Sequence, residues 1–112
     1  MILILKEPAT PDQVKEMLFP LGMYIKLAVD VERAMLAGGG ELHADCEQAL
    51  LEAGSRQEDI WGADWDLAGE VRFESLINIR PRQGNRSLEI QSSELRERVE
   101  RIVRRIFQGA EP

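Results

Sequence analysis

The chain has 112 residues, of which 44% are hydrophobic and 30% charged, and we expect a single globular domain over residues 1–112. Acidic residues outnumber basic ones by 20 to 14, which gives a formal net charge of -6. A field of that sign disfavours non-specific nucleic-acid binding and attachment to anionic membranes.

The cysteine content and the N-terminal segment predict a cytoplasmic protein. Cys46 is the only cysteine, so no disulfide can form within the chain, as is usual in a reducing compartment. Residues 2–5 form a short apolar run with no basic region before it and no small-residue cleavage site after it. We therefore expect neither a signal peptide nor a membrane span.

The first half of the chain predicts a strand, then a helix, and then a hairpin of two strands. Residues 2–5 fit a buried strand, and residues 10–13 (TPDQ) fit a helix start with a capping box and Pro at the first helical position. Residues 23–32 alternate between apolar and polar side chains, which predicts a strand. A return strand at 35–37 is expected to end in the three glycines 38–40, where the backbone bends sharply or approaches another group.

The second half predicts two more helices and two or three strands. A short helix is expected at 45–53, with Gly54 as its stop, and strands are expected at 59–65 and 71–80. A polar loop at 81–87 leads into a brief strand at 88–90. The last helix begins at Ser92 or Ser93 and runs to Ile106 with one apolar stripe.

Strands with one apolar face and helices with one apolar stripe bury each other. The expected fold is therefore α+β, a mostly antiparallel sheet of four to five strands with about three helices packed on one face. The other face of the sheet is then polar or a dimer interface.

Acidic residues around the only histidine are the first candidate for chemistry. In an extended stretch, Glu41, His43, Asp45 and Glu47 project on one side at two-residue spacing, and the first three are the predicted metal ligands. Imidazole and carboxylates are ligands for a divalent metal such as zinc, manganese or iron, although no cofactor is required by the sequence. The structural alternative is that Asp45 caps a helix, Glu47 is solvated in its first turn, and His43 is a polar surface or turn residue.

A run of arginines and amides is the second candidate. Guanidinium and amide donors beside a glycine form a cradle for a small anion such as phosphate or carboxylate. The predicted ligand-binding residues are Asn78, Arg80, Arg82, Asn85, Arg86 and Ser87. The structural alternative is a solvated turn whose arginines pair with Asp30, Glu32 or the last helix.

Two predicted strands could join these polar groups into one pocket. Asp30 and Glu32 lie on the outward face of one strand, and Asn78 and Arg80 on the outward face of another. If the strands are neighbours, acid and base meet on one open sheet surface. Asp30 and Glu32 are therefore included among the candidate ligand-binding residues.

The remaining distinctive residues favour packing over chemistry. Trp61 and Trp65 lie four residues apart in a predicted strand, so both face the same side and are expected in the core. Cys46 occupies an apolar helix position and is expected to be a buried, unreactive thiol. The sequence has no Ser-His-Asp spacing, phosphate-binding loop, dinucleotide fingerprint or zinc-finger pattern.

Several separated segments resemble a bacterial family known only as a domain of unknown function, numbered 5674 and found in cyanobacteria among other bacteria. The segments are LAVDVE at 27–32, GGELHAD at 39–45, GS at 54–55, WG at 61–62, INIRP at 77–81 and GNRS at 84–87. The resemblance extends from about Met1 to Ile106 and implies no activity. Cys46 departs from it, because the family has an acidic residue there, which argues against a cysteine mechanism.

These features predict a small cytoplasmic binding or accessory protein that recognises an anion at residues 80–87. A homodimer is expected, since Leu76 is an apolar residue on the outer face of the predicted sheet. The alternative is a metal-dependent hydrolase acting on a phosphoester. Its metal ligands would be Glu41, His43 and Asp45, with Arg80 and Arg86 stabilising developing negative charge.

Overall fold

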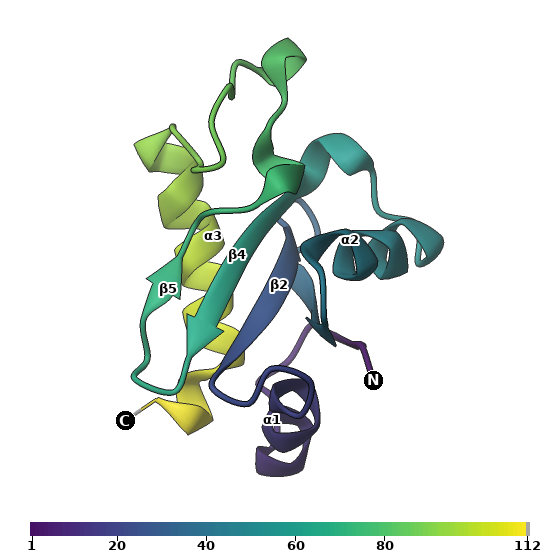
Figure 1. Cartoon of the computed structure of the whole chain (residues 1–112), viewed down its shortest axis with the longest axis vertical. Helices are drawn as coiled ribbons and strands as arrows, with labels where there is room; N and C mark the ends of the chain where they lie inside the picture. The colour runs from purple at the N-terminus through teal and green to yellow at the C-terminus, as the bar shows by residue number, and fades with distance from the viewer. Residues whose placement is uncertain (112) are drawn as a thin grey trace.

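A computed structural model describes residues 1–111 and shows a five-stranded antiparallel sheet with three α-helices (Figure 1). The strand order is β1-β3-β2-β4-β5. The strands are β1 (Leu3–Leu5), β2 (Tyr24–Asp30), β3 (Met35–Gly40), β4 (Ile60–Asp66) and β5 (Val71–Arg72), and the helices are α1 (Pro11–Leu18), α2 (His43–Glu52) and α3 (Ser93–Ile106). The predicted α+β class is confirmed. No helix within residues 1–111 is long and apolar enough to cross a membrane.

The helices cover both faces of the sheet, which corrects the expectation that they share one face. Ile25 and Leu27 of β2 belong to the core cluster that packs against α1 and α3. Ala28, on the opposite face, packs with Cys46 and Leu50 of α2. Figure 1 shows α2 in front of the sheet and α3 behind it. The alternation in β2 predicts a polar second face, but on that face Ala28 is buried against α2 and Asp30 is buried as well.

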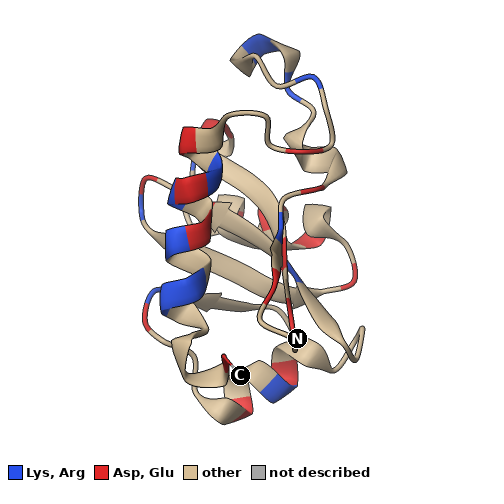
Figure 2. Cartoon of the chain, turned by 90° about the vertical axis from the view of Figure 1, so that its left-hand side faces the viewer, with Lys and Arg blue, Asp and Glu red and all other residues tan. Residues whose placement is uncertain are grey.

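The larger core lies under α3. Trp61 and Trp65 both belong to it, as predicted, and the Trp65 ring stacks on Phe107 with centroids 4.6 Å apart. The apolar stripe of α3 faces this core, and the charged residues of the helix face outward (Figure 2). On that outer face Arg104 pairs with Glu100 one turn earlier, at 2.9 Å.

The predicted helix starts hold for α1 and α3. Thr10 caps α1, and both hydrogen bonds of the Thr10–Gln13 capping box are present. Ser92 caps α3 by accepting a hydrogen bond from the Leu95 backbone. The middle helix α2 begins at His43, two residues earlier than predicted, and its N-cap residue makes no side-chain hydrogen bond.

Three predictions about strands are wrong. The glycines at 38–40 are part of β3 and do not end the hairpin. Gly39 has φ of 105°, and a Cβ there would lie 2.5 Å from the Met1 carbonyl oxygen, so only glycine fits this point of the strand. The second error concerns 71–80, where β5 stops at Arg72 and the chain turns through a 3-10 helix, Leu76–Asn78. The brief strand expected at 88–90 is a single bridge between Glu74 and Glu89.

Gly62 controls how closely the segment after β5 approaches β4. A Cβ at this position would lie 2.5 Å from Ser75 Cβ. We expect Gly62→Ala to lower the free energy of unfolding by about 1–3 kcal/mol, because the inserted methyl displaces the segment that contains Ser75. Urea denaturation measures this change. Gly109→Ala is the matched control, since nothing lies within 4 Å of the corresponding position there. Equal stability of the two variants would contradict the close approach.

Candidate functional site

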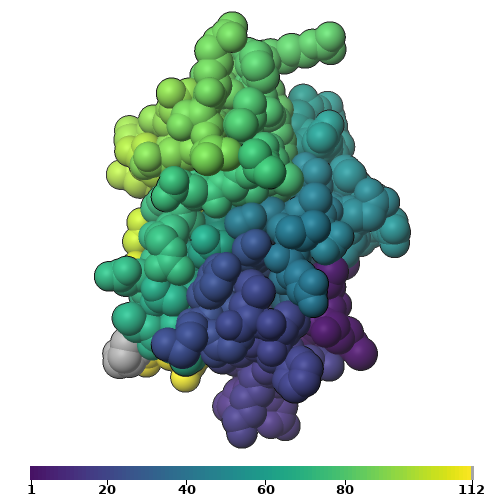
Figure 3. Space-filling model, in the orientation of Figure 1, coloured from purple at the N-terminus to yellow at the C-terminus, as the bar shows by residue number. Residues whose placement is uncertain are grey.

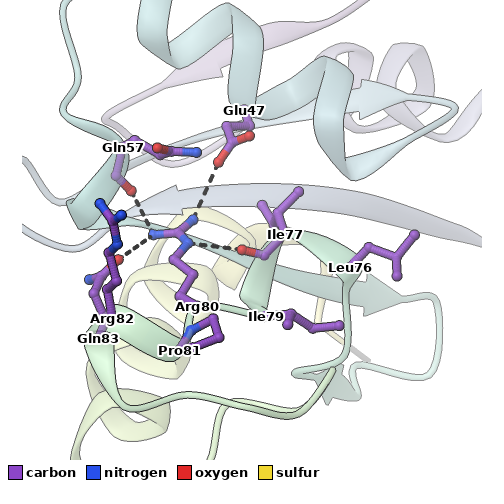
Figure 4. A pocket seen from close by; sticks show the side chains of 9 residues that line it. All are labelled: Glu47, Gln57, Leu76, Ile77, Ile79, Arg80, Pro81, Arg82 and Gln83. Carbon is purple, nitrogen blue, oxygen red and sulfur yellow. Dashed lines mark hydrogen bonds and ion pairs between the residues drawn. The ribbon is translucent and has the colours of Figure 1, made fainter.

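A cavity of about 560 Å³ lies between α2 and residues 76–83, and we call it the Arg80 cavity. Its polar lining comes from Glu47, Gln57, Arg80, Arg82 and Gln83, and its apolar lining from Leu76, Ile77, Ile79 and Pro81. Figure 4 shows Arg80 in the middle, with Arg82 and Gln83 on one side and Leu76 and Ile79 on the other. The sequence identified Arg80 and Arg82 but gave no signal for Gln57, which lies more than twenty residues away.

The Arg80 guanidinium is bound by backbone carbonyl groups from two segments. Its Nε donates to the Ile77 carbonyl oxygen at 2.9 Å, and Nη1 donates to the Gln57 carbonyl oxygen at 2.6 Å. Its Nη2 also donates to the Ile60 carbonyl oxygen. The Arg80 side chain is 9% exposed and stacks over the Trp61 ring, 4.7 Å from the centroid. Arg80 therefore ties residues 77–80 to the start of β4.

Side chains use the remaining donors of Arg80. Nη2 lies 3.3 Å from Glu47 Oε2, and Nη1 lies 3.3 Å from Gln83 Oε1. Burial lowers the pKa of the guanidinium, and the charge of Glu47 opposes that change. The group stays charged, as arginine does in proteins, and its five N–H groups are all taken. Arg80 is therefore part of the scaffold, and its charge is balanced by Glu47.

Asn78 and Asn85, which were predicted as ligand-binding residues, are also buried within the protein. Asn78 Oδ1 accepts from the Gly62 N–H at 2.7 Å, and Asn78 Nδ2 donates to the Gly62 carbonyl oxygen at 3.1 Å. Asn85 Nδ2 donates to the Asn78 carbonyl oxygen at 2.8 Å, and Asn85 Oδ1 accepts from the Gln91 N–H at 2.8 Å. These two side-chain amides thus make hydrogen bonds to backbone groups that a neighbouring strand would otherwise provide.

The last three predicted anion ligands have different surroundings. The Ser87 hydroxyl accepts from the Glu89 N–H at 3.1 Å and so supports the loop. Arg86 is exposed and does not line the Arg80 cavity. Arg82 is exposed, lines the cavity and has no side-chain hydrogen bond or ion pair among residues 1–111. Arg82 is thus the predicted ligand-binding residue whose charge is available inside a cavity.

The pocket expected between Asp30, Glu32, Asn78 and Arg80 is not formed, which corrects that hypothesis. Asp30 is buried, and its Oδ2 accepts from the Ser55 hydroxyl at 2.6 Å while its Oδ1 accepts two backbone N–H groups of the hairpin turn. Glu32 pairs with Arg98 of α3 at 3.3 Å. The physical reason is that β4 lies between β2 and the segment after β5, so the two predicted strands are not neighbours.

The residues proposed as metal ligands are not gathered by the structure. The segment is helical from His43, so Glu41, His43 and Asp45 do not follow the two-residue alternation of a strand. His43 Nε2 instead lies 2.8 Å from Asp64 Oδ1 of β4, a contact with no local sequence signal. Across residues 1–111, no group of three His, Cys, Asp or Glu side chains is placed to hold a metal ion.

His43 lines a second cavity, of about 260 Å³, that we call the His43 cavity. Lys26 and Leu42 also line it, and it shares Leu76 and Ile77 with the Arg80 cavity. The two cavities therefore adjoin at Leu76 and Ile77.

Cys46 is a buried free thiol, as predicted. Its Sγ donates to the Lys26 carbonyl oxygen at 3.5 Å, and burial is the main cause that raises the pKa of the thiol. A raised pKa lowers the thiolate fraction, which fits a packing role.

The Asn78 amide gives a direct test of the scaffold. In the Asn78→Asp variant, a carboxylate oxygen replaces Nδ2 and faces the carbonyl oxygens of Gly62, Phe73 and Leu88, each 3.1 Å away from Nδ2. We expect a loss of about 3 kcal/mol in the free energy of unfolding, measured by urea denaturation.

Gln91→Glu is the matched control for that variant, because it makes the same chemical change at an exposed side chain of the same segment. Its Oε1 still accepts from the Arg86 N–H, and we expect a change of about 0.5 kcal/mol or less. Similar losses of unfolding free energy in the two variants would contradict the structural role given to the Asn78 amide.

Comparison with known proteins gives one match. The family described as "Protein of unknown function (DUF5674)" matches residues 3–106. No curated protein and no solved structure matches the chain. The matched span begins with β1 and ends with α3, so it includes the whole sheet and both cavities. The resemblance inferred from the separated motifs is confirmed, and the chain belongs to the DUF5674 family.

Proposed function

We propose that this protein is a small binding protein whose ligand combines an apolar group with an anionic group, and that the Arg80 cavity is the binding site. The main support for this proposal is that Arg82 lines the cavity beside solvent-exposed apolar side chains. The Arg82 guanidinium has no hydrogen bond or ion pair among residues 1–111. Within the loop that the sequence predicts to recognise an anion, Arg82 is therefore the arginine that we propose to contact the ligand.

The apolar part of the proposed ligand would contact one side of the cavity. Leu76 is 77% exposed and Ile79 is 45% exposed, and both lie on the side opposite Arg82 (Figure 4). Exposed apolar side chains grouped at a cavity are typical of surfaces that bind a ligand or a partner. Removing them from water would supply the non-specific part of the binding free energy.

The anionic part of the ligand would contact Arg82. Arg80 and Glu47 neutralise each other in the cavity, so Arg82 supplies its uncompensated charge. A guanidinium binds a carboxylate or phosphate through two parallel N–H donors, which selects such a group over a neutral one. The net charge of -6 repels anions at long range, so this recognition would be short-range and local.

The proposal also includes the cytoplasmic location expected from the sequence. The buried, unpaired thiol of Cys46 is compatible with a reducing compartment. The metal-dependent hydrolase gains no support from side-chain placement, because the described residues bring no third ligand to His43 and Asp64.

Hexanoate and 1-hexanol are matched probes for the two parts of the site, because they share an alkyl chain and differ in the charged group. We expect the full chain to bind hexanoate more tightly than 1-hexanol in an NMR titration, with shifts in residues 76–83. Arg82→Ala should weaken hexanoate binding about three- to fivefold, the range of an exposed ion pair, and leave 1-hexanol binding unchanged.

Arg86→Ala is the control, because it removes the same charge from the same turn but outside the cavity. Its hexanoate affinity should equal that of the unaltered protein. Equal hexanoate affinity in all three proteins, or shifts confined to another surface, would contradict the proposed site.

A further inference from the structure

Three exposed apolar side chains follow one another across the face that contains both cavities. Leu42 lines the His43 cavity, Leu76 lines both cavities, and Ile79 lines the Arg80 cavity. Their exposed fractions are 57%, 77% and 45%. Figure 3 shows this face, on which the green segment that includes residues 76–83 adjoins the teal region of α2. Leu76 is thus an exposed apolar side chain that borders both cavities.

The two ends of this face carry opposite charges. Arg82 lies at the end formed by the Arg80 cavity. Glu41 and Asp45 are exposed on either side of the Leu42–Ala44 segment that lines the His43 cavity. The Lys26 ammonium, which lines the same cavity and donates to the backbone carbonyl of Glu41, offsets one of these two negative charges, and neither carboxylate has an ion pair among residues 1–111. Both charged ends are therefore available to a partner.

This arrangement is complementary to itself under two-fold symmetry. In an isologous dimer, each side of the interface meets the opposite side of the partner's identical surface. An axis that passes beside Leu76, across the line between the cavities, would bring the two copies of Leu76 together. It would also place Arg82 opposite Glu41 of the partner subunit, and Ile79 opposite Leu42 of the partner subunit.

We propose that a second copy of this chain occupies the face formed by the two cavities, in this two-fold register. The inference rests on the proposed function, in which the Arg80 cavity binds an apolar group beside an anionic group. The Glu41–Asp45 segment has both, because the Leu42 side chain lies beside two carboxylates. Each subunit then provides a ligand segment for the Arg80 cavity of its partner and binds the partner's segment in its own cavity. Free hexanoate competes with the second copy for Arg82 and so favours the monomer.

Sedimentation equilibrium of the full chain over a hundredfold range of concentration tests the dimer. We expect the mass to rise from monomer to dimer, and added hexanoate to lower it. Leu76→Glu should weaken dimerisation about tenfold or more, because two carboxylates then meet at the axis. Leu76 is 77% exposed, so this variant should keep its fold, which circular dichroism checks.

Charge reversal tests the register. Arg82→Glu should weaken the dimer because it then faces Glu41 of the partner subunit, and adding Glu41→Lys to that variant should restore it. Arg86→Glu makes the same charge change outside the cavity and should leave the dimer unaffected. A monomer at every concentration, a dimer unaffected by Leu76→Glu, or no restoration in the double variant would overturn the proposal.

The small-molecule titration separates this proposal from the binding function. A monomer whose hexanoate affinity still depends on Arg82 would leave the binding function standing with another occupant and would reject the second copy. A dimer that depends on Leu76 and on the charge pair, in a protein that does not bind hexanoate, would support the interface and reject the small-ligand site.

Discussion

The side-chain amide of Asn78 pairs with both backbone groups of Gly62, and the arrangement of the candidate site depends on this contact. The distances are 2.7 Å from the Gly62 N–H to Oδ1 and 3.1 Å from Nδ2 to the Gly62 carbonyl oxygen. Because β5 ends at Arg72, no strand continues along this edge of β4. A buried backbone amide without a partner is costly, so the Asn78 side chain does what the next residues of a strand would otherwise do.

The amide also fixes the position of the residues that follow it. Arg80 comes two residues later and is placed over Trp61, where its guanidinium meets Glu47 of α2. A buried charge needs both a counter-ion and hydrogen-bond acceptors. The acceptors are the backbone carbonyls of Ile60 at the start of β4, of Gln57 in the 3-10 turn just before it, and of Ile77. The conspicuous polar residues are thus used inside the protein, whereas Leu76, Ile79 and Arg82 are presented at the surface.

The sequence predicted the elements whose side-chain period decides their structure. Strand β2 alternates clearly, Trp61 and Trp65 of β4 recur at an even spacing, and the capping residues of α1 and α3 mark the starts of these helices. Strand β3 was missed beyond residue 37 because glycines carry no side-chain period. Residues 71–80 also alternate, but only residues 71–72 pair with β4. Beyond them the Asn78 amide donates to the Gly62 and Phe73 carbonyls, a difference that alternation alone does not reveal.

Of the predicted ligand-binding residues, Arg80 and Arg82 line the Arg80 cavity, but the sequence did not reveal the structural role of each residue. Arginine and asparagine have the same chemistry whether they face a ligand or the backbone of another segment, and only the fold separates these cases. The side chains of Arg80 and Asn85 donate to backbone carbonyls within the protein, whereas Arg82 is exposed in the Arg80 cavity. The contact between His43 and Asp64 joins residues more than twenty positions apart, and no local pattern indicates it.

The role of Asn78 is most directly tested by hydrogen exchange at the Gly62 amide. This N–H lies at the edge of β4 where β5 no longer pairs with it, and Asn78 Oδ1 is its acceptor. The structure predicts that it exchanges as slowly as the amides that β4 donates to β2, and that Asn78→Ala makes it exchange fast while those ladder amides keep their protection. Fast exchange at Gly62 in the unaltered protein would contradict the account.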